Sequence, residues 1–164
     1  MTTSTATVST ATVPAVGTTM PDVDLVGPDG ATTTLHRARS GGPAVVYFLR
    51  AAGCPVCVRH ARSLVELAGQ GRLADGVRVL LVAPGGPAEA AELARRVGAV
   101  GGGADVGVWA SGEGHASAGL GSFLSLQHSG TFAVGADGDV RYRRTATLPP
   151  QSFSRGELLE VLGR

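Results

Sequence analysis

Two nearly continuous apolar runs constrain the fold of this 164-residue chain more than any other feature of its sequence. The runs are AVVYFL at residues 44–49 and VRVLLVA at residues 77–83. Long stretches of β-branched and aromatic residues are typical of strands that are buried on both faces. Such strands belong to sheets that helices cover on both sides. We therefore expect an α/β domain built around a buried central sheet.

A helical pattern follows each of these runs. Apolar residues keep helical spacing from Pro55 to about Gly69, and AEAAELARRVG at residues 88–98 predicts an amphipathic helix that ends at Gly98. VGVWA at residues 106–110 predicts a third, shorter strand, and the glycine-rich segment after it predicts a short, weak helix. Strands that alternate with helices in this way form parallel sheets.

Hairpin patterns flank this alternating centre. PDVDLVGPDGATTTL at residues 21–35 turns at Gly27–Gly30, and TFAVGADGDVRY at residues 131–142 turns through Asp137 and Gly138. The last helix is expected in SRGELLEVLG, with Ser154 as its N-cap and Glu157 completing a capping box. The sequence thus predicts a mixed sheet with helices on both faces and an N-terminal β-hairpin extension.

Composition and charge exclude several classes of function. The chain is 43% hydrophobic and carries a net charge of only +1, so we expect neither a nucleic-acid partner nor membrane binding. Residues 1–16 form a Thr/Ser/Ala tract that predicts a disordered tail, which leaves one domain over residues 17–164. This tract lacks the features of a secretory signal, so we expect a cytoplasmic protein.

The only two cysteines, Cys54 and Cys57, lie in the segment GCPVC between the first buried strand and its helix. A helix N-terminus carries a partial positive charge, which stabilises a thiolate. Two intervening residues bring the cysteines within bonding reach, so that one can attack a disulfide and the other can resolve the mixed disulfide. The pattern predicts a redox-active dithiol.

The segment VVYFLRAAGCPVCVRHARSL resembles the redoxin branch of the thioredoxin-like superfamily, which includes peroxiredoxin-like proteins of the alkyl hydroperoxide reductase/thiol-specific antioxidant type. The early hairpin and the segment GTFAVGADGDVRY resemble redoxin elements too, so the resemblance covers residues from about 17 to 162. It implies a thioredoxin-like three-layer sandwich and an oxidoreductase acting on thiol/disulfide or peroxide groups. The implied partners are a small-molecule or protein disulfide or peroxide substrate and a cellular thiol reductant. A homodimer is compatible with the resemblance.

Two departures from the redoxin pattern concern the site. The peroxiredoxin motif P-x-x-x-T/S-x-x-C is missing: Arg50 and Cys54 take the proline and threonine places if Cys57 is aligned, and Tyr47 and Ala51 take them if Cys54 is aligned. Ser129 lies near the place of the peroxiredoxin arginine or the thioredoxin cis-proline. The thioredoxin alignment makes Cys54 the nucleophile and the peroxiredoxin alignment makes it Cys57; we favour Cys54, the outer cysteine.

Four further residues are candidates for the site. His60 follows Cys57 by three residues and could assist its proton transfer, or it could be an ordinary helix residue. Arg50 could hold a thiolate or an anionic substrate, or it could be a solvated strand-end residue. His128 could contribute to docking or anion binding. His115, in the glycine-rich segment, could line a pocket.

Other interpretations of the cysteine pair lead to other classes of function. A structural zinc site needs four ligands and no suitable histidine pair accompanies the cysteines, so we expect no metal and no cofactor. A purely structural disulfide would close too short a loop to stabilise the fold greatly. The alternatives to a thiol–disulfide oxidoreductase are a thiol-dependent peroxidase, reducing hydrogen peroxide or organic hydroperoxides, and a non-catalytic redox-sensing or binding module.

Overall fold

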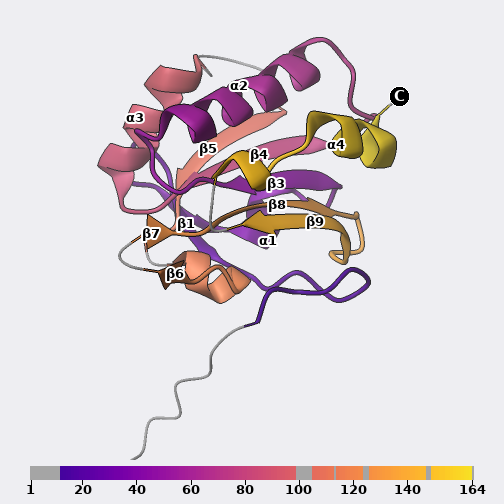
Figure 1. The fold of residues 1–164 in the computed structure, drawn as a ribbon, viewed down its shortest axis with the longest axis horizontal. Helices are drawn as coiled ribbons and strands as arrows, with labels where there is room; N and C mark the ends of the chain where they lie inside the picture. Colours follow the sequence, from indigo (N-terminus) through magenta and orange to yellow (C-terminus); the bar gives the residue numbers. More distant parts are fainter. Residues whose placement is uncertain (1–11, 99–104, 113, 124–125, 147–148, 164) are drawn as a thin grey trace, which may run out of the picture.

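A seven-stranded sheet forms the centre of the protein (Figure 1). The computed structural model describes residues 12–98, 105–112, 114–123, 126–146 and 149–163. The strands follow the order β2-β1-β5-β4-β3-β8-β9 across the sheet. Their bounds are β1 Asp24–Val26, β2 Thr32–Thr34, β3 Ala44–Phe48, β4 Arg78–Ala83, β5 Val106–Ala110, β8 Ser129–Val134 and β9 Val140–Ala146.

The helices and a small second sheet complete the fold. The short strands β6 and β7 pair antiparallel with each other, apart from the main sheet. Their bounds are β6 Ser122–Phe123 and β7 Leu126–Gln127; the helices are α1 Leu35–Ala38, α2 Pro55–Gly69, α3 Pro87–Val97 and α4 Arg155–Leu162; the 3₁₀ helices are η1 Gly114–Ala118 and η2 Pro149–Gln151.

The sheet is mixed, as the sequence predicts. Strands β3, β4 and β5 run parallel to one another, and β8 and β9 add an antiparallel hairpin beside β3. The N-terminal hairpin β1–β2 joins the opposite side, where Val26 pairs with Ala110 of β5. Both predicted hairpins and all three predicted central strands are confirmed.

Helices cover both faces of the sheet, which confirms the three-layer sandwich. Figure 1 shows α2, α3 and α4 above one face, and their core side chains pack with alternate residues of β3, including Val45 and Tyr47. Val46 and Phe48 point to the other face and pack with α1, with η1 and with the segment before β1. All five residues of β3 are fully buried. The sheet is therefore a rigid platform for whatever follows its strand ends.

Helix α2 begins inside the cysteine motif and ends at Gly69, as the apolar spacing predicts. Cys54 is the N-cap and Pro55 takes the first helical position, where its missing N–H leaves no gap in the hydrogen bonding. Residues at helical spacing, such as Val58, Ala61 and Leu64, are buried against the sheet. The strand, the turn and the helix together fix both cysteines at one end of the sheet.

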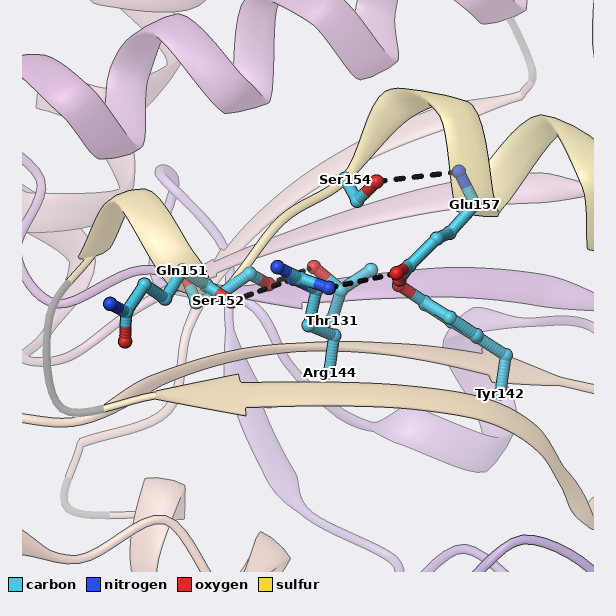
Figure 2. A network of polar contacts seen from close by, with 7 residues as sticks. All are labelled: Thr131, Tyr142, Arg144, Gln151, Ser152, Ser154 and Glu157. Carbon is cyan, nitrogen blue, oxygen red and sulfur yellow. Dashed lines mark hydrogen bonds and ion pairs between the residues drawn. The ribbon is translucent and has the colours of Figure 1, made fainter.

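Helix α4 corrects one detail of the prediction. Ser154 is its N-cap and accepts from the Glu157 N–H, but Glu157 does not complete a capping box. The Glu157 carboxylate instead accepts hydrogen bonds from Tyr142 and Arg144 of β9, at 2.6 and 2.9 Å (Figure 2). These two neighbours outcompete the N-cap N–H for the carboxylate, and they tie α4 to the sheet.

The remaining differences concern short elements and the chain end. Helix α1 has only four residues and was not expected from the apolar pattern. The predicted tail over residues 1–16 lies mostly outside the described residues, which begin at residue 12. Within its last part, the main-chain oxygens of Val13 and Pro14 accept hydrogen bonds from Arg143. Among the helices of the described chain, none is long and apolar enough to cross a membrane.

Candidate active site

Cys54 lies where the β3 segment turns into helix α2, and its sulfur caps that helix. The Cys54 Sγ accepts a hydrogen bond from the Cys57 main-chain N–H at 3.4 Å. The side chain is 7% exposed, so a narrow part of it faces solvent. The helix N-terminus stabilises negative charge on an atom in this position. The geometry that the sequence predicts for Cys54 is thus present.

Cys57 lies behind Cys54 and is wholly buried. Burial and a hydrogen bond with Cys54 raise the pKa of the Cys57 thiol to about 11, although hydrogen bonds from the Arg50 main chain and the Tyr47 hydroxyl act in the opposite direction. Both cysteines are free thiols. The pair therefore consists of an outer thiol at a helix end and an inner thiol without contact with solvent.

Among the described residues, no hydrogen bond joins His60 to either cysteine. The Tyr47 hydroxyl links His60 to Cys57 instead. The Tyr47 hydroxyl is 3.1 Å from the His60 Nδ1, and it also makes side-chain hydrogen bonds with Cys57 and Ser152. Phe153 stacks on the His60 ring, with centroids 4.8 Å apart. Burial, followed by the charge of Arg59, lowers the pKa of His60 below its usual value of 6.5. His60 is therefore linked to Cys57, but through a second residue.

Arg50 and His128 lie at the same end of the sheet as the cysteines. Arg50 contacts Cys57 through its main chain. His128 and Ser129 lead into β8, whose Gly130 pairs with Phe48 at the end of β3. The His128 Nε2 and the Ser129 Oγ are buried, and neither has a hydrogen-bond partner among the described residues. This part of the chain thus offers unused polar atoms beside the strand that precedes the dithiol.

His115 does not line a pocket, which corrects the sequence-based hypothesis. Its ring is wholly buried in the core between η1 and the sheet. Its Nδ1 lies 2.7 Å from the Ser111 Oγ and its Nε2 lies 2.8 Å from the Leu49 main-chain oxygen. Burial lowers the pKa of His115 to about 4. Both nitrogens are already used within the fold, so this histidine fastens the segment after β5 to the end of β3.

One hollow in the described surface lies away from the cysteines. It has a volume of about 480 Å³ and lies over β1, β2 and the end of β5, where Thr33, Arg37 and Ser111 contribute to its wall. Neither cysteine lines it. Among the described residues, no cluster of histidine, cysteine and acidic side chains could hold a metal ion.

Sequence reasoning missed the residues that surround Cys57 on the sheet side. Tyr47 belongs to the apolar run that predicts a buried strand, and Ser152 and Phe153 lie in the segment before α4, which carries no motif. One signal was available for Tyr47, because a buried tyrosine hydroxyl needs a hydrogen-bond partner. No comparable signal in the sequence pointed to Ser152 or Phe153.

The family model that matches this chain is Redoxin, over residues 15–162. The match spans most of the chain, so the protein belongs to the redoxin family. It is an oxidoreductase that acts on thiol or peroxide groups. The resemblance seen in the cysteine segment and in the two hairpins is thereby confirmed.

Solved structures confirm the thioredoxin-like fold. A peroxiredoxin-like protein from Aquifex aeolicus is 15% identical with a TM-score of 0.75, over 92% of this chain and 87% of its own. Peroxidoxin BcpB from Mycobacterium tuberculosis is 20% identical with a TM-score of 0.70, over 90% of this chain and 96% of its own. A thiol peroxidase from Chromobacterium violaceum is 14% identical with a TM-score of 0.66, over 90% and 84%. No curated protein matches the chain.

Proposed function

We propose that this protein is a thiol–disulfide oxidoreductase in which Cys54 attacks and Cys57 resolves. One observation carries the proposal: the Cys54 sulfur caps helix α2 and reaches the surface, while Cys57 has no exposed surface. A substrate disulfide can therefore meet only the Cys54 sulfur. The helix end supplies the positive potential that a thiolate nucleophile requires.

The reaction proceeds in two exchanges. The Cys54 thiolate attacks one sulfur of the substrate disulfide, forms a mixed disulfide and releases the first substrate thiolate. The Cys57 thiolate then attacks the Cys54 sulfur, forms the Cys54–Cys57 disulfide and releases the second substrate thiolate. The two leaving thiolates take up the two protons that the cysteines lose. The substrate gains two electrons, and a cellular thiol reductant returns them to the protein in the next cycle.

We propose the cytoplasm as the compartment of this reaction. A dithiol that must be regenerated after each turnover works in a reducing environment, for which the cytoplasm is the proposed location. Whether the protein works as a monomer or as a homodimer does not alter the two exchanges, because both cysteines come from one chain.

Trapping the mixed disulfide tests the proposal. Cys57→Ser should retain a covalent adduct on Cys54 after reaction with a small aromatic disulfide, and mass spectrometry should locate it there. Cys54→Ser should acquire no adduct at a comparable rate, and the double variant serves as the blank. An adduct on Cys57 of the Cys54→Ser protein that forms as fast as the Cys54 adduct would reverse the assignment of the two cysteines.

Peroxide reduction is a second candidate, supported by the fold that this chain shares with structures described as peroxiredoxin-like and thiol peroxidase. The Cys54 thiolate would attack the peroxide, form a sulfenic acid and release water or an alcohol, and Cys57 would close the disulfide. Ala51 stands at the threonine place for this alignment, which weakens the candidate. Peroxide consumption no faster than that of free cysteine, with a thiol donor present, would remove it.

A further inference from the structure

The Tyr47 hydroxyl is a buried junction between a reacting thiol and an imidazole. Tyr47 lies in the middle of β3 and its side chain is wholly buried on the α2 side of the sheet. Its hydroxyl makes hydrogen bonds with the Cys57 and Ser152 side chains and lies 3.1 Å from the His60 Nδ1. Cys57 and His60, one turn apart on α2, and Ser152, which is distant in the sequence, thus converge on one oxygen atom.

Cys57 needs such a junction, because it has no direct way to lose its proton. Its side chain has no exposed surface, so solvent cannot accept the proton. The thiol must nevertheless become a thiolate before it can attack the mixed disulfide on Cys54. His60 is only half-buried, so its ring can exchange a proton with solvent. A path from Cys57 to Tyr47 and on to His60 therefore leads from the buried thiol to the surface.

We propose that Tyr47 passes the proton of Cys57 to His60 during the resolving step; this rests on the proposed oxidoreductase function. The S–H bond of Cys57 breaks and its proton moves to the Tyr47 oxygen, while the proton of Tyr47 moves to the His60 Nδ1. The products are a Cys57 thiolate and a His60 imidazolium. The thiolate then attacks the Cys54 sulfur, the substrate thiolate leaves, and His60 returns its proton to solvent.

The hydroxyl suits this transfer because it can reverse its hydrogen bonds without moving. Before the transfer, Tyr47 accepts from the Cys57 thiol and donates to the His60 Nδ1. After the transfer, it accepts from the protonated His60 Nδ1 and donates to the Cys57 thiolate. A tyrosine hydroxyl can do both, because it is at once a donor and an acceptor. The transfer requires the His60 tautomer that carries its proton on Nε2.

The titration behaviour of the groups defines their protonation states before the transfer. The lowered pKa of His60 keeps its imidazole neutral at pH 7 and able to accept a proton. Burial, followed by the charge of Cys57, raises the pKa of Tyr47 above its ordinary value, so a free tyrosinate does not accumulate and the two transfers are coupled. The other charged or titratable groups that act on this pair are Cys54 on Tyr47 and Arg59 on His60.

The segment before α4 holds the three groups in place. The Phe153 ring stacks on His60 and also packs against Tyr47, with centroids 5.9 Å apart in the second contact. The Thr131 Oγ1 donates to the Ser152 main-chain oxygen at 2.7 Å, as Figure 2 shows. Arg144 of β9 donates to the neighbouring Gln151 oxygen at 2.7 Å. These contacts keep the path short while the cysteines react.

Stopped-flow reaction with dithiobis(nitrobenzoic acid), with the protein in excess, separates the two exchanges. The first release of thionitrobenzoate reports the attack by Cys54, and the second reports resolution by Cys57. Tyr47→Phe should slow the second release by at least about 10-fold and change the first by less than about 2-fold, because general acid–base assistance of this kind is lost only from the second step. In deuterium oxide, the second release of the wild type should slow and that of Tyr47→Phe should not.

Two further variants make the result decisive. His60→Gln should slow the same release and remove its loss of rate on acidification below pH 6.5, and it keeps the proposal testable should Tyr47→Phe not fold. Tyr142→Phe is the matched control, because the Tyr142 hydroxyl bonds Glu157 instead of the dithiol, and it should leave both releases unchanged.

The outcomes separate this inference from the proposed function. An unchanged second release in folded Tyr47→Phe, or in His60→Gln, would overturn the proton path while leaving the dithiol mechanism intact. Absence of the first release from the wild type would count against the oxidoreductase itself.

Discussion

Two histidines lie on opposite faces of β3, and each rests against a neighbouring aromatic residue of that strand. His60 packs against Tyr47 on the α2 side, with ring centroids 5.9 Å apart and an interplanar angle of 63°. His115 packs against Phe48 on the other side, at 5.0 Å and 78°. The ring geometry is thus nearly the same. The two residues differ in what their nitrogens can reach.

His115 is sealed from solvent, whereas His60 is partly exposed to it. Both nitrogens of His115 are occupied by partners that stay in place, and the ring has no contact with solvent. His60 shares one nitrogen with a hydroxyl that also touches a thiol, and part of its ring is exposed. The comparison teaches that a histidine beside a reactive strand end becomes a proton carrier only if a path to solvent remains. Otherwise its hydrogen bonds serve only to hold segments of the fold together.

The largest effect on stability is expected from removal of the buried histidine, His115. His115→Ala leaves the Leu49 oxygen and the Ser111 hydroxyl without their partner and opens a cavity, so it should lower the free energy of unfolding by about 3 to 4 kcal/mol. Urea denaturation measures this value. In the remaining folded protein, the second thionitrobenzoate release should keep the pH dependence of the wild type. A loss of unfolding free energy smaller than that of His60→Ala would contradict the structural role assigned to His115.

Acid should weaken the stabilising contribution of His115 in the wild type. The folded pKa of His115, about 4, lies below its ordinary value of 6.5, so the folded state binds fewer protons between these pH values. Its contribution is full above pH 6.5 and is lost as the pH falls toward 4, by about 3 kcal/mol in all. The difference in unfolding free energy between wild type and His115→Gln, followed by urea denaturation over this range, should shrink on acidification. Parallel curves for the two proteins would contradict this.

A smaller effect on stability is expected from removal of the partly exposed histidine, His60. His60→Ala loses one hydrogen bond and the stack on Phe153, but water can reach the vacated space, so the free energy of unfolding should fall by about 1 to 2 kcal/mol. His36→Ala, at another half-buried histidine far from the cysteines, is the control. Urea denaturation and the second release should separate the two positions: only His60→Ala should slow resolution.

Much of the fold was predictable because the chain is strongly patterned. The runs 44–49 and 77–83 have the composition of doubly buried strands, and glycine or proline marks the places where elements end. Short elements escaped prediction. Helix α1 has a single turn and depends on Thr34, whose side chain accepts from the Arg37 N–H, a signal too local to stand out. The role of Glu157 could not be foreseen, because Tyr142 and Arg144 reach it only through tertiary packing.

Only the part of the candidate site that is formed by neighbouring residues in the sequence could be predicted. The motif places Cys54 at the start of α2 and Cys57 one turn further, and local geometry suffices to infer their arrangement. The surroundings of Cys57 come from three distant segments: the middle of β3, the α2 turn with His60, and the link to α4 with Ser152 and Phe153. The spacing of His60 and Cys57 within one helix indicates that these two lie near each other, but nothing in the sequence shows that Tyr47, Ser152 and Phe153 meet them.

The capping role of Cys54 also has a thermodynamic consequence. In the dithiol form its sulfur completes the start of α2, and an electron-rich sulfur accepts this hydrogen bond better than one engaged in a disulfide. Helix α2 is then held more firmly in the reduced protein. Through the thermodynamic cycle that links folding to oxidation, whatever favours the reduced form raises the reduction potential of the pair. The tendency of this protein to give or take electrons is thus set in part by the first turn of one helix.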